Sequence, residues 1–534
     1  MHLGVDFGTT RTIVAYADRG NYPVVTFPDV DGDAQEYVPT VVALDGDDLV
    51  FGFDALRAAR DGAVPLRSFK RALASPEVGP HTSVTVGGRQ MPLLDVITGF
   101  AAALRRELAT VSSVRDLLDT SSNPPAGPDT PGTSRLLDPE PVTAAIAVPA
   151  HAHGAQRFLT LEAFRRAGFE VTAMINEPSA AGLEYSHRQG RTLNSRRTRV
   201  VVYDLGGGTF DASLVKVDGT DHEVLDSLGL NNVGGDDVDA VLAACVLDAA
   251  GAQREALSAA EYEELLGECR EAKERLSPQA KRLVIDLQGS PVVLPVARFY
   301  EAATPLVEQT VSAMGPLLGM LGESDTPDLA DIAGIYLVGG ASGLPLVPRL
   351  LREQFGRRVH RSPYPAASTA IGLAIAGDRG AGFSLTDRLS RGFGVFREGD
   401  AGRRLSFDPI IGREAVLPAA GAERVVITRR YVAAHNVGWF RFVEYAALDD
   451  WGEPRGDIVP FAHVVFPFEP SLQGLDDAAL RAVPVERRDG GPLVEERYTI
   501  DPNGLIEVSL TCVDTGFSQR HAFRSESEQR VGTR

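Results

Sequence analysis

The stretch Tyr203-Asp204-Leu205-Gly206-Gly207-Gly208-Thr209-Phe210-Asp211 decides how the rest of the chain is interpreted. The β-branched run Val200-Val201-Val202 precedes it, and an alternating run from Ala212 to Val217 follows it. This pattern predicts a hairpin whose turn is three glycines flanked by carboxylates and a hydroxyl. Glycine tolerates positive φ, and successive backbone N–H groups in such a turn form a concave anion site. Asp204 and Asp211 suit a magnesium ion with its waters, and a plain tight turn is the alternative.

The N-terminus repeats this device. Residues 3–14, Leu3-Gly4-Val5-Asp6-Phe7-Gly8-Thr9-Thr10-Arg11-Thr12-Ile13-Val14, predict a strand, a turn and a strand. The turn again joins a carboxylate, a glycine and hydroxyls. Two such hairpins, one near the start and one after residue 200, indicate an internal duplication of a nucleotide-binding lobe.

Composition limits the class of protein. A chain of 534 residues is too long for one compact core, so two to four domains are expected, and a hydrophobic content of 44% suffices to pack them. The net charge of −19 argues against binding to nucleic acid or to an acidic membrane surface, because both need basic faces. The three cysteines form neither a disulfide framework nor a metal-ligand spacing. Since Leu3 already begins a strand, no signal peptide is expected, and we expect a cytoplasmic protein.

Predicted strands and helices alternate as far as residue 378, which indicates an α/β domain over 1–378. The predicted strands after the first hairpin are Val38–Leu44, Ala144–Val148, Val171–Ile175 and Ile335–Val338. The predicted helices are Leu93–Leu108, Gly154–Ala167, one opening at Gly234-Gly235-Asp236-Asp237, Ser258 to about Leu276, and Ala366–Ala376. The low-complexity residues 121–141 predict a disordered surface insertion.

The composition changes after Asp378. Residues 379–390 predict a linker, 391–524 a β-rich domain, and 525–534 a frayed tail. The predicted strands of this domain are Val425–Thr428, Trp439–Tyr445, Val464–Phe468, Arg497–Ile500 and Ile506–Thr511. Asp501-Pro502-Asn503-Gly504 is a strong hairpin turn between the last two. The pattern favours an all-β sandwich or barrel.

The order of these segments resembles the actin-like ATPase superfamily, which includes sugar kinases, actins and the seventy-kilodalton heat-shock (DnaK-type) chaperones. Several motifs are similar to those of the chaperones in particular. They are Leu3–Thr10, Ser68-Phe69-Lys70-Arg71, Ala147-Val148-Pro149-Ala150 with Gln156-Arg157, Ile175–Ala181, Tyr203–Asp211, Cys269–Ser277 and Leu337-Val338-Gly339-Gly340. The resemblance covers residues 1 to about 378 and continues weakly at Thr499–Ser509. It implies an actin-like (ribonuclease H-like) two-lobed ATPase domain followed by a β-sandwich domain.

The resemblance implies that ATP or ADP lies with Mg²⁺ between two lobes. Asp6 and Asp204 would hold Mg²⁺ through its waters, and Lys70 would stabilise charge at the γ-phosphate. Glu177 and Asp211 would orient the attacking water, with Thr209 as a further catalytic residue. The residues expected to bind the nucleotide are Gly8, Thr9, Thr10, Gly206, Gly207, Gly208, Gly234, Gly235, Lys273, Ser277, Gly339 and Gly340.

Each role has a plainer alternative. Lys70 taken alone is a solvated surface lysine, and Glu177 taken alone is a helix-start charge favourable to the helix dipole. Lys273 and Ser277 are alternatively part of an ordinary exposed helix face, which also carries Arg270 and Glu274.

The sequence departs from the pattern of the chaperones in three places. Ala341 and Gly343 stand where the family usually has Ser and Arg, which removes a surface on which adenine can stack. Phe383–Asp387 replaces the usual acidic, leucine-rich linker. The chain stops soon after the β domain, so the helical lid of the family is expected to be missing.

These observations predict a DnaK-like ATPase whose nucleotide state sets the posture of a C-terminal β domain. That domain is expected to bind unfolded or extended peptide by strand addition, and co-chaperones are conceivable partners. A small-molecule kinase of the same superfamily is one alternative, and it predicts substrate-dependent ATP consumption. A nucleotide-gated scaffold with little hydrolysis is another, which single-turnover measurements with and without a client peptide would distinguish.

Overall fold

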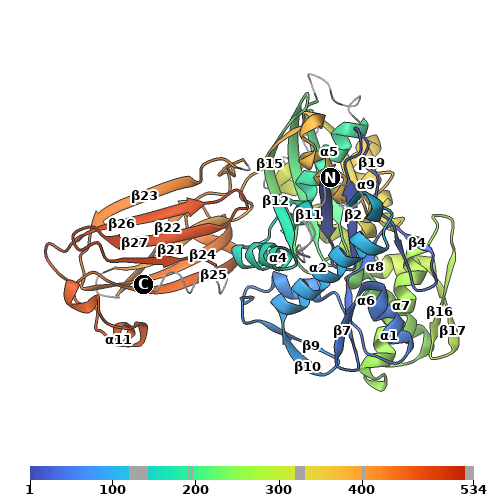
Figure 1. Ribbon diagram of the computed structural model, residues 1–534. Helices are drawn as coiled ribbons and strands as arrows, with labels where there is room; N and C mark the ends of the chain where they lie inside the picture. Colours follow the sequence, from blue (N-terminus) through green and yellow to red (C-terminus); the bar gives the residue numbers. More distant parts are fainter. Residues whose placement is uncertain are drawn as a thin grey trace, which may run out of the picture. The chain divides into compact units, whose positions relative to one another are not determined.

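The computed structural model describes residues 1–118, 142–189, 193, 197–318, 331–399, 403–419 and 421–523. The chain divides into two compact units (Figure 1). The α/β unit comprises Met1–Arg71, Ser83–Ala150 and Ala163–Leu385, and the β unit comprises Ala72–Thr82, His151–Glu162 and the chain from Thr386 onward. The predicted insertion at 121–141 and the predicted tail at 525–534 lie outside the described residues.

Two larger sheets organise the α/β unit. The first has the order β12 (Phe169–Asn176), β11 (Val142–Val148), β1 (Leu3–Phe7), β2 (Arg11–Tyr16), β5 (Val38–Pro39). The second has the order β19 (Val359–Arg361), β18 (Ile332–Val338), β13 (Arg199–Leu205), β14 (Phe210–Asp218), β15 (Asp221–Leu230), β20 (Ser384–Thr386). In both, an antiparallel hairpin is followed by two strands that run parallel to its first strand. This shared arrangement is what a duplicated lobe predicts.

Smaller sheets and helices complete the unit. The remaining strands are β3 (Phe27–Pro28), β4 (Ala34–Gln35), β6 (Val41–Asp45), β7 (Asp48–Phe51), β8 (Leu66–Arg67), β9 (Ser83–Val86), β10 (Arg89–Pro92), β16 (Arg282–Leu287) and β17 (Ser290–Pro295). The helices up to residue 378 are α1 (Gly52–Arg60), α2 (Leu93–Thr110), α3 (Arg115–Leu118), α4 (Gly154–Arg166), α5 (Glu177–Gln189), α6 (Gly235–Ala250), α7 (Ala259–Glu274), α8 (Val296–Ala313), α9 (Leu346–Phe355) and α10 (Ser368–Gly377). Of these, α4 belongs to the β unit as far as Glu162. The predicted capping box is present at the start of α7, where Ser258 and Glu261 bond reciprocally.

Glycines bring the central elements of the α/β unit into close contact. A Cβ on Gly372 of α10 would overlap the carbonyl oxygen of Ala180 in α5, and a Cβ on Gly4 of β1 would overlap the backbone of α10 at Ala370. Helix α10 therefore packs directly on both β1 and α5, because no side chain keeps the backbones apart.

Aromatic packing fixes the position of β1. The Phe7 ring, which is fully buried, lies 5.6 Å from the ring of Phe100 in α2 and 5.8 Å from that of Phe164 in α4. Phe69, which begins a short 3₁₀ helix, lies 5.9 Å from Phe100. Such offset and edge contacts add to the burial of apolar area. They hold Asp6 and Lys70, the neighbours of Phe7 and Phe69, at the base of one cavity.

The β unit contains two four-stranded antiparallel sheets, drawn in orange and red in Figure 1. One has the order β22 (Arg404–Ile411), β21 (Gly392–Gly399), β24 (Val437–Leu448), β25 (Pro454–Pro467), and the other β23 (Val425–Val432), β26 (Leu493–Ile500), β27 (Ile506–Cys512), β28 (Ser518–His521). A short helix, α11 (Asp477–Arg481), accompanies them. Phe393 of the first sheet contacts Tyr498 of the second at 6.1 Å between ring centroids, so the sheets pack face to face as a sandwich.

The predicted turn joins β26 to β27. The Asp501 side chain accepts hydrogen bonds from the backbone N–H groups of Asn503 and Leu505, and Gly504 has a φ of +75°. The sequence located the cores of β23 to β27, whereas it did not predict β21, β22 or β28.

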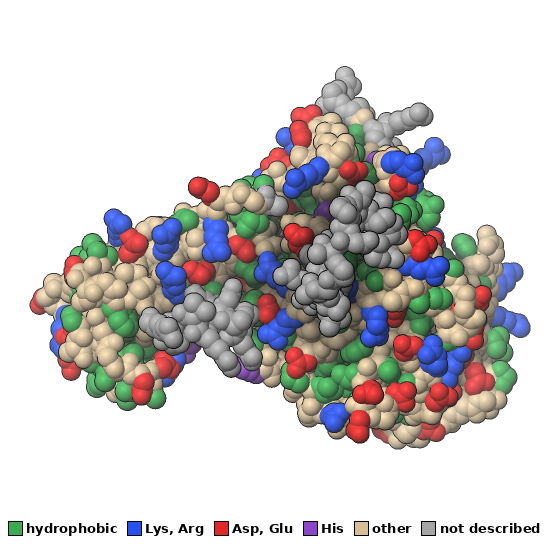
Figure 2. Space-filling model, viewed as in Figure 1, with side chains coloured by type: hydrophobic (Ala, Val, Ile, Leu, Met, Phe, Trp, Pro, Cys, Tyr) green, Lys and Arg blue, Asp and Glu red, His purple; other side chains and the backbone are tan. Residues whose placement is uncertain are grey.

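The surface carries charges of both signs. On the face shown in Figure 2, acidic and basic side chains are interspersed, although acidic residues are in excess over the whole sequence. In the part of the chain that the structure describes, no helix is long and apolar enough to span a membrane.

Candidate functional site

A cavity of about 350 Å³ in the α/β unit is lined by both glycine turns. Its walls also include the ends of strands β13 and β18 and the first turns of helix α6. Fourteen of the eighteen predicted site residues line it: Asp6, Gly8, Thr9, Thr10, Lys70, Glu177, Asp204, Gly206, Gly207, Thr209, Gly235, Lys273, Gly339 and Gly340. The structure thus brings together segments that lie more than 300 residues apart in the chain.

The two turns touch each other directly. A Cβ on Gly207 would lie 2.7 Å from the Thr10 methyl, and a Cβ on Gly208 would lie 2.9 Å from the Thr9 methyl. Any side chain at these positions would separate the turns, so the glycines are needed for close approach. Gly208 itself does not line the cavity.

The start of α6 is joined to the second turn by backbone hydrogen bonds. Gly235 N–H donates to the carbonyl of Gly206 at 2.9 Å, and Asp236 N–H donates to that of Gly207 at 2.7 Å. A Cβ on Gly234 would lie 2.6 Å from the Gly207 oxygen. Gly234 is therefore a close-packing residue outside the cavity, whereas Gly235 lines it.

Acidic groups and one lysine are buried at the base of the cavity. Lys70 is 6% exposed, and its Nζ lies 2.9 Å from Oε1 of Glu177 and 5.4 Å from the Phe7 ring centroid. Burial lowers the pKa of Lys70, but the carboxylates of Glu177 and Asp6 outweigh it, so that the pKa is raised and the lysine stays charged. Burial, followed by the charge of Glu177, raises the pKa of Asp6 to about 7. Burial, followed by the charges of Glu177, Asp6 and Asp211, raises the pKa of Asp204 well above its ordinary value.

These two carboxylates fit a divalent cation. The ionised form of two buried acidic groups is costly on its own, and it becomes favourable when a cation neutralises the charge. Among the described residues no group of three or more His, Cys, Asp or Glu side chains is placed to chelate a metal. Mg²⁺ is commonly held by one or two carboxylates together with waters and substrate phosphates, so Asp6 and Asp204 suit this ion.

Glu177 and Asp211 occupy different settings. Glu177 is the first residue of α5, where the chain leaves β12, and its side chain lines the cavity beside Lys70. Asp211 lies opposite Asp204 across the β13–β14 hairpin and is 1% exposed. Its Oδ1 accepts a hydrogen bond from Ala150 N–H at 2.8 Å, which ties the β13–β14 hairpin to the end of β11. Asp211 does not line the cavity.

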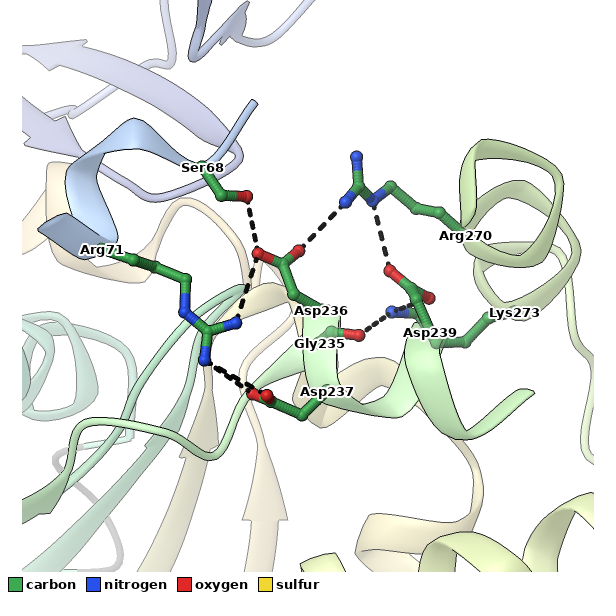
Figure 3. A network of polar contacts seen from close by, with 8 residues as sticks. All are labelled: Ser68, Arg71, Gly235, Asp236, Asp237, Asp239, Arg270 and Lys273. Carbon is green, nitrogen blue, oxygen red and sulfur yellow. Dashed lines mark hydrogen bonds and ion pairs between the residues drawn. The ribbon is translucent and has the colours of Figure 1, made fainter. Parts of the chain in front are cut away.

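Charged side chains form a network beside the cavity, shown in Figure 3. Asp236 accepts from Ser68 Oγ at 2.6 Å and from Arg270 Nη2 at 3.0 Å, so it bridges the segment before Lys70 and helix α7. Arg71 Nη2 lies 3.2 Å from Asp237. The carboxylates at the start of α6 also complement the positive end of its dipole. Further along α7, Lys273 donates to the carbonyl of Gly235 at 2.7 Å and pairs with Asp239 at 2.6 Å.

The prediction that Lys273 and Arg270 lie on an exposed face of α7 is wrong. Lys273 is 8% exposed and Arg270 is half-buried, because both face carboxylates at the start of α6. Ser277 lies beyond the end of α7, is exposed, and does not reach the cavity. Sequence spacing placed these residues on one face, but α7 ends at Glu274, before the face reaches Ser277.

Another part of the cavity wall follows β18, which ends at Val338: the next residue, Gly339, has a φ of +81°, and a Cβ on it would overlap Asp204. The departures noted in the sequence, Ala341 and Gly343, line the cavity here. Arg361, at the end of β19, lines it beside Gly343.

Sequence reasoning missed other cavity residues. Those that carry charge are Arg11, Asp236, Asp239, Arg270, Glu274 and Arg361. Arg11 could have been predicted as a cavity residue, because it directly follows Thr10. Its Nη2 lies 2.5 Å from Glu274, and its guanidinium lies 4.4 Å from the Tyr37 ring centroid. No signal in the sequence pointed to Arg361.

Comparison with known proteins places the sequence among chaperones. A sequence model of the family described as Hsp70 protein matches residues 133–424. A chaperone protein HscA homolog of Ralstonia nicotianae is 31% identical over 527 residues, covering 95% of this chain and 75% of that protein. HscA homologs of Burkholderia ambifaria and Burkholderia multivorans are each 33% identical over 435 residues. Those matches cover 79% of this chain, and the chain spans 65% of the length of each of these two relatives.

Proposed function

The chain belongs to the Hsp70 protein family, a family of ATP-dependent chaperones, and we propose that it binds and hydrolyses ATP in the cavity between its two glycine turns. One observation carries this proposal: Asp6, Asp204 and both turns line the same cavity, and the turns are in contact. In the family's actin-like fold, two such hairpins close around one polyphosphate. The duplicated strand arrangement of the two larger sheets supports that fold for this chain.

The residues at the base of the cavity supply binding and charge stabilisation. Backbone N–H groups of the turns Gly8–Thr10 and Gly206–Thr209 hold the phosphates, because such groups form an anion site. Asp6 and Asp204 hold Mg²⁺ through its waters, and the ion neutralises charge on the phosphates when it is bound. Lys70 adds a fixed positive charge, so that little reorganisation is needed during the reaction.

Glu177 is the residue we propose to orient the attacking water. It lines the cavity, it is held by Lys70, and its carboxylate accepts hydrogen bonds. Thr209 lines the cavity at the second turn and contributes a hydroxyl there. For Asp211 we propose a positioning role, since its contact with Ala150 fixes the hairpin that carries Asp204.

Single-turnover hydrolysis of Mg·ATP by the full chain tests this proposal. We expect Lys70→Ala to slow hydrolysis by about 10²-fold or more, as the loss of one preorganised charge-stabilising group does elsewhere. Lys216→Ala is the matched control, because Lys216 is an exposed lysine on β14 outside the cavity. Equal rates for Lys70→Ala and the control, or no Mg²⁺-dependent ATP binding by the wild-type chain, would contradict the assignment.

For the β unit we propose binding of unfolded or extended peptide in the cytoplasm. Among the described residues, β22 and β23 are edge strands of the sandwich, and an extended peptide can add to such an edge through backbone hydrogen bonds. Most residues of β23 are exposed, including Val425, Val426 and Val432, which gives the edge apolar contacts for side chains of a peptide. Fluorescence anisotropy of a labelled unstructured peptide tests this, and no saturable binding in either nucleotide state would contradict it.

The small-molecule kinase is not favoured. The relatives reported above are chaperones, and the family match continues beyond the α/β unit into the β unit, to residue 424.

A further inference from the structure

At Ala341 and Gly343 the cavity lacks the Ser and Arg side chains that the resemblance led us to expect, and another residue lies close to Gly343. Gly343 has no side chain, and a Cβ built on it would lie 3.1 Å from Nη2 of Arg361. Arg361 comes from β19, whose backbone pairs with β18, with Arg361 opposite Leu337. The guanidinium thus extends from a neighbouring strand over the position that a side chain at residue 343 would fill.

Arg361 differs from the other cations around the cavity. Arg11 pairs with Glu274, Lys70 with Glu177, Arg270 with Asp236 and Asp239, and Lys273 with Asp239. Within the described part of the chain, the guanidinium of Arg361 has neither a hydrogen bond nor an ion pair. A planar cation that lines a cavity and is not neutralised by the protein is available to a ligand.

We propose that Arg361 is the base-stacking residue of the nucleotide site, with its guanidinium plane against the face of the nucleobase. The inference rests on the proposed nucleotide site and adds to it a specificity-determining residue. Guanidinium groups stack on aromatic rings, and the attraction is electrostatic in addition to apolar contact. Nucleobases are recognised in this way on arginine planes.

A guanidinium that stacks on a nucleobase contacts the face of the ring and not the groups at its edge. The kind of base that the site accepts follows from this. Ala341 carries no hydrogen-bonding side chain, so it cannot read a base edge. A site whose main base contact is one guanidinium plane is expected to accept adenine and guanine with similar affinity, because every purine presents the same kind of face. The ligand is thus a purine nucleoside di- or triphosphate with Mg²⁺.

Two probes separate the base from the phosphates. Isothermal titration of the full chain is carried out with Mg·ADP and with Mg·pyrophosphate, which lacks base and ribose. Arg361→Ala is expected to weaken ADP binding between about threefold and thirtyfold, the range of a cation over an aromatic ring, and to leave pyrophosphate binding unchanged. Arg361→Lys keeps the charge but loses the plane, so it is expected to lose most of the same affinity.

Two further variants sharpen the test. Gly343→Ala places a methyl group 3.1 Å from the guanidinium and is expected to weaken ADP binding by displacing Arg361, again without an effect on pyrophosphate. Arg357→Ala is the control, since Arg357 is an exposed arginine of the segment before β19 and lies outside the cavity. It is expected to bind ADP as the wild-type chain does.

The outcomes are distinct. Equal ADP affinity for Arg361→Ala and the control overturns the stacking role, and a parallel loss of pyrophosphate affinity shows a phosphate contact instead, which also overturns it. A preference of the wild-type chain for ADP over GDP of more than tenfold overturns the purine-tolerant site. If the wild-type chain binds neither ADP nor pyrophosphate, the proposed nucleotide site itself fails and Arg361 has no base to stack on.

Discussion

Asp204 is buried and Asp6 is half-buried in the cavity that Glu177 also lines, and desolvation together with the charge of Glu177 makes each of the two carboxylates harder to ionise. Lys70 offsets part of the cost, and a bound Mg²⁺ would remove more of it. Acidic residues held in this way lower the stability of the ligand-free protein, a common expense of functional sites.

We therefore expect Asp204→Asn to raise the stability of the ligand-free α/β unit by about 1–2 kcal/mol, because a neutral amide is less costly to bury. The same variant should lose the stabilisation that Mg·ADP gives the wild-type chain, which is about 2.7 kcal/mol at 100 times the Kd. Thermal unfolding with and without Mg·ADP measures both effects.

The control for this experiment is Asp218→Asn, at the exposed end of the same hairpin. It should change neither the ligand-free stability nor the response to Mg·ADP. If Asp204→Asn keeps the full response to Mg·ADP, Asp204 has no part in holding the cation.

At the scale of residues, the sequence predicted the parts of the site that lie in local motifs. Asp6, Lys70, Glu177 and Asp204 each stand within a recognisable stretch, and the structure brings all four to one cavity. Arg361 could not be predicted, because its place depends on the parallel pairing of β19 with β18, which joins segments separated by helix α9. The sequence showed that residue 343 has no side chain, but it did not show that Arg361 lies next to that position.

At the scale of elements, helix α10 depends on its glycine. We expect Gly372→Ala to destabilise the α/β unit by about 1–3 kcal/mol, because the new methyl group overlaps the backbone of Ala180 in α5 and neither helix can yield cheaply. Thermal unfolding followed by far-ultraviolet circular dichroism measures the change.

Gly267→Ala is the matched control in another helix, α7, where a Cβ meets no other atom within 4 Å. There the same substitution should stabilise by up to about 1 kcal/mol, since alanine is the better helix former. Equal effects of the two substitutions would mean that α5 and α10 are not in the close contact described.

Helix α2 carries a carboxylate that should make the stability of the α/β unit depend on pH. Burial, followed by the charge of Asp54, raises the pKa of Glu107 from 4.5 to about 7. The folded state therefore binds more protons than the unfolded state between these values, so stability falls as pH rises from about 4.5 to about 7.

Glu107→Gln should remove this fall, and the variant should exceed the wild-type chain in stability at pH 8 by an amount that shrinks towards pH 5. The upper limit of the difference is about 3 kcal/mol, which corresponds to the whole pKa change. Urea unfolding followed by helical circular dichroism measures it. Glu264→Gln, an exposed position on α7, should show no such pH-dependent gain, and an identical pH profile for both variants would refute the prediction.

The elements also show where sequence patterns fail. The sequence predicted strand β26 only from Arg497, whereas the strand begins at Leu493. The prediction missed its first residues because Glu496, a charged residue, stands at an inward-facing position. That carboxylate is fully buried and is satisfied by Arg397 at 2.5 Å and by the hydroxyl groups of Tyr431 and Tyr498. A charge on the inner face breaks the alternation that defines a strand in sequence, and its partner lies about 100 residues away.

At the scale of the whole molecule, the expected linker 379–390 is divided between the two units. Ser384 and Leu385 belong to the α/β unit, where β20 is the edge strand beyond β15, and Ser384 N–H donates to the carbonyl of Thr220 at 3.1 Å. Composition alone marked the joint by its glycines and could not show that part of it forms a strand. The path between the proposed nucleotide site and the proposed peptide site therefore begins with a strand of the larger sheet and not with a free tether.

If the nucleotide state sets the behaviour of the β unit, the coupling must be reciprocal. Suppose that peptide affinity differs between the ATP and ADP states by some factor. Peptide must then change the ratio of the ATP and ADP affinities by the same factor. Glu177→Gln is a suitable background for the measurement, because ATP should persist when the carboxylate that we propose to orient the attacking water is lost. We expect a factor of about 5 to 150, the usual range for such coupling. Anisotropy of a labelled peptide gives one ratio and nucleotide titration with saturating peptide gives the other. The two ratios must agree, and a ratio of one in both directions would show that the units work independently.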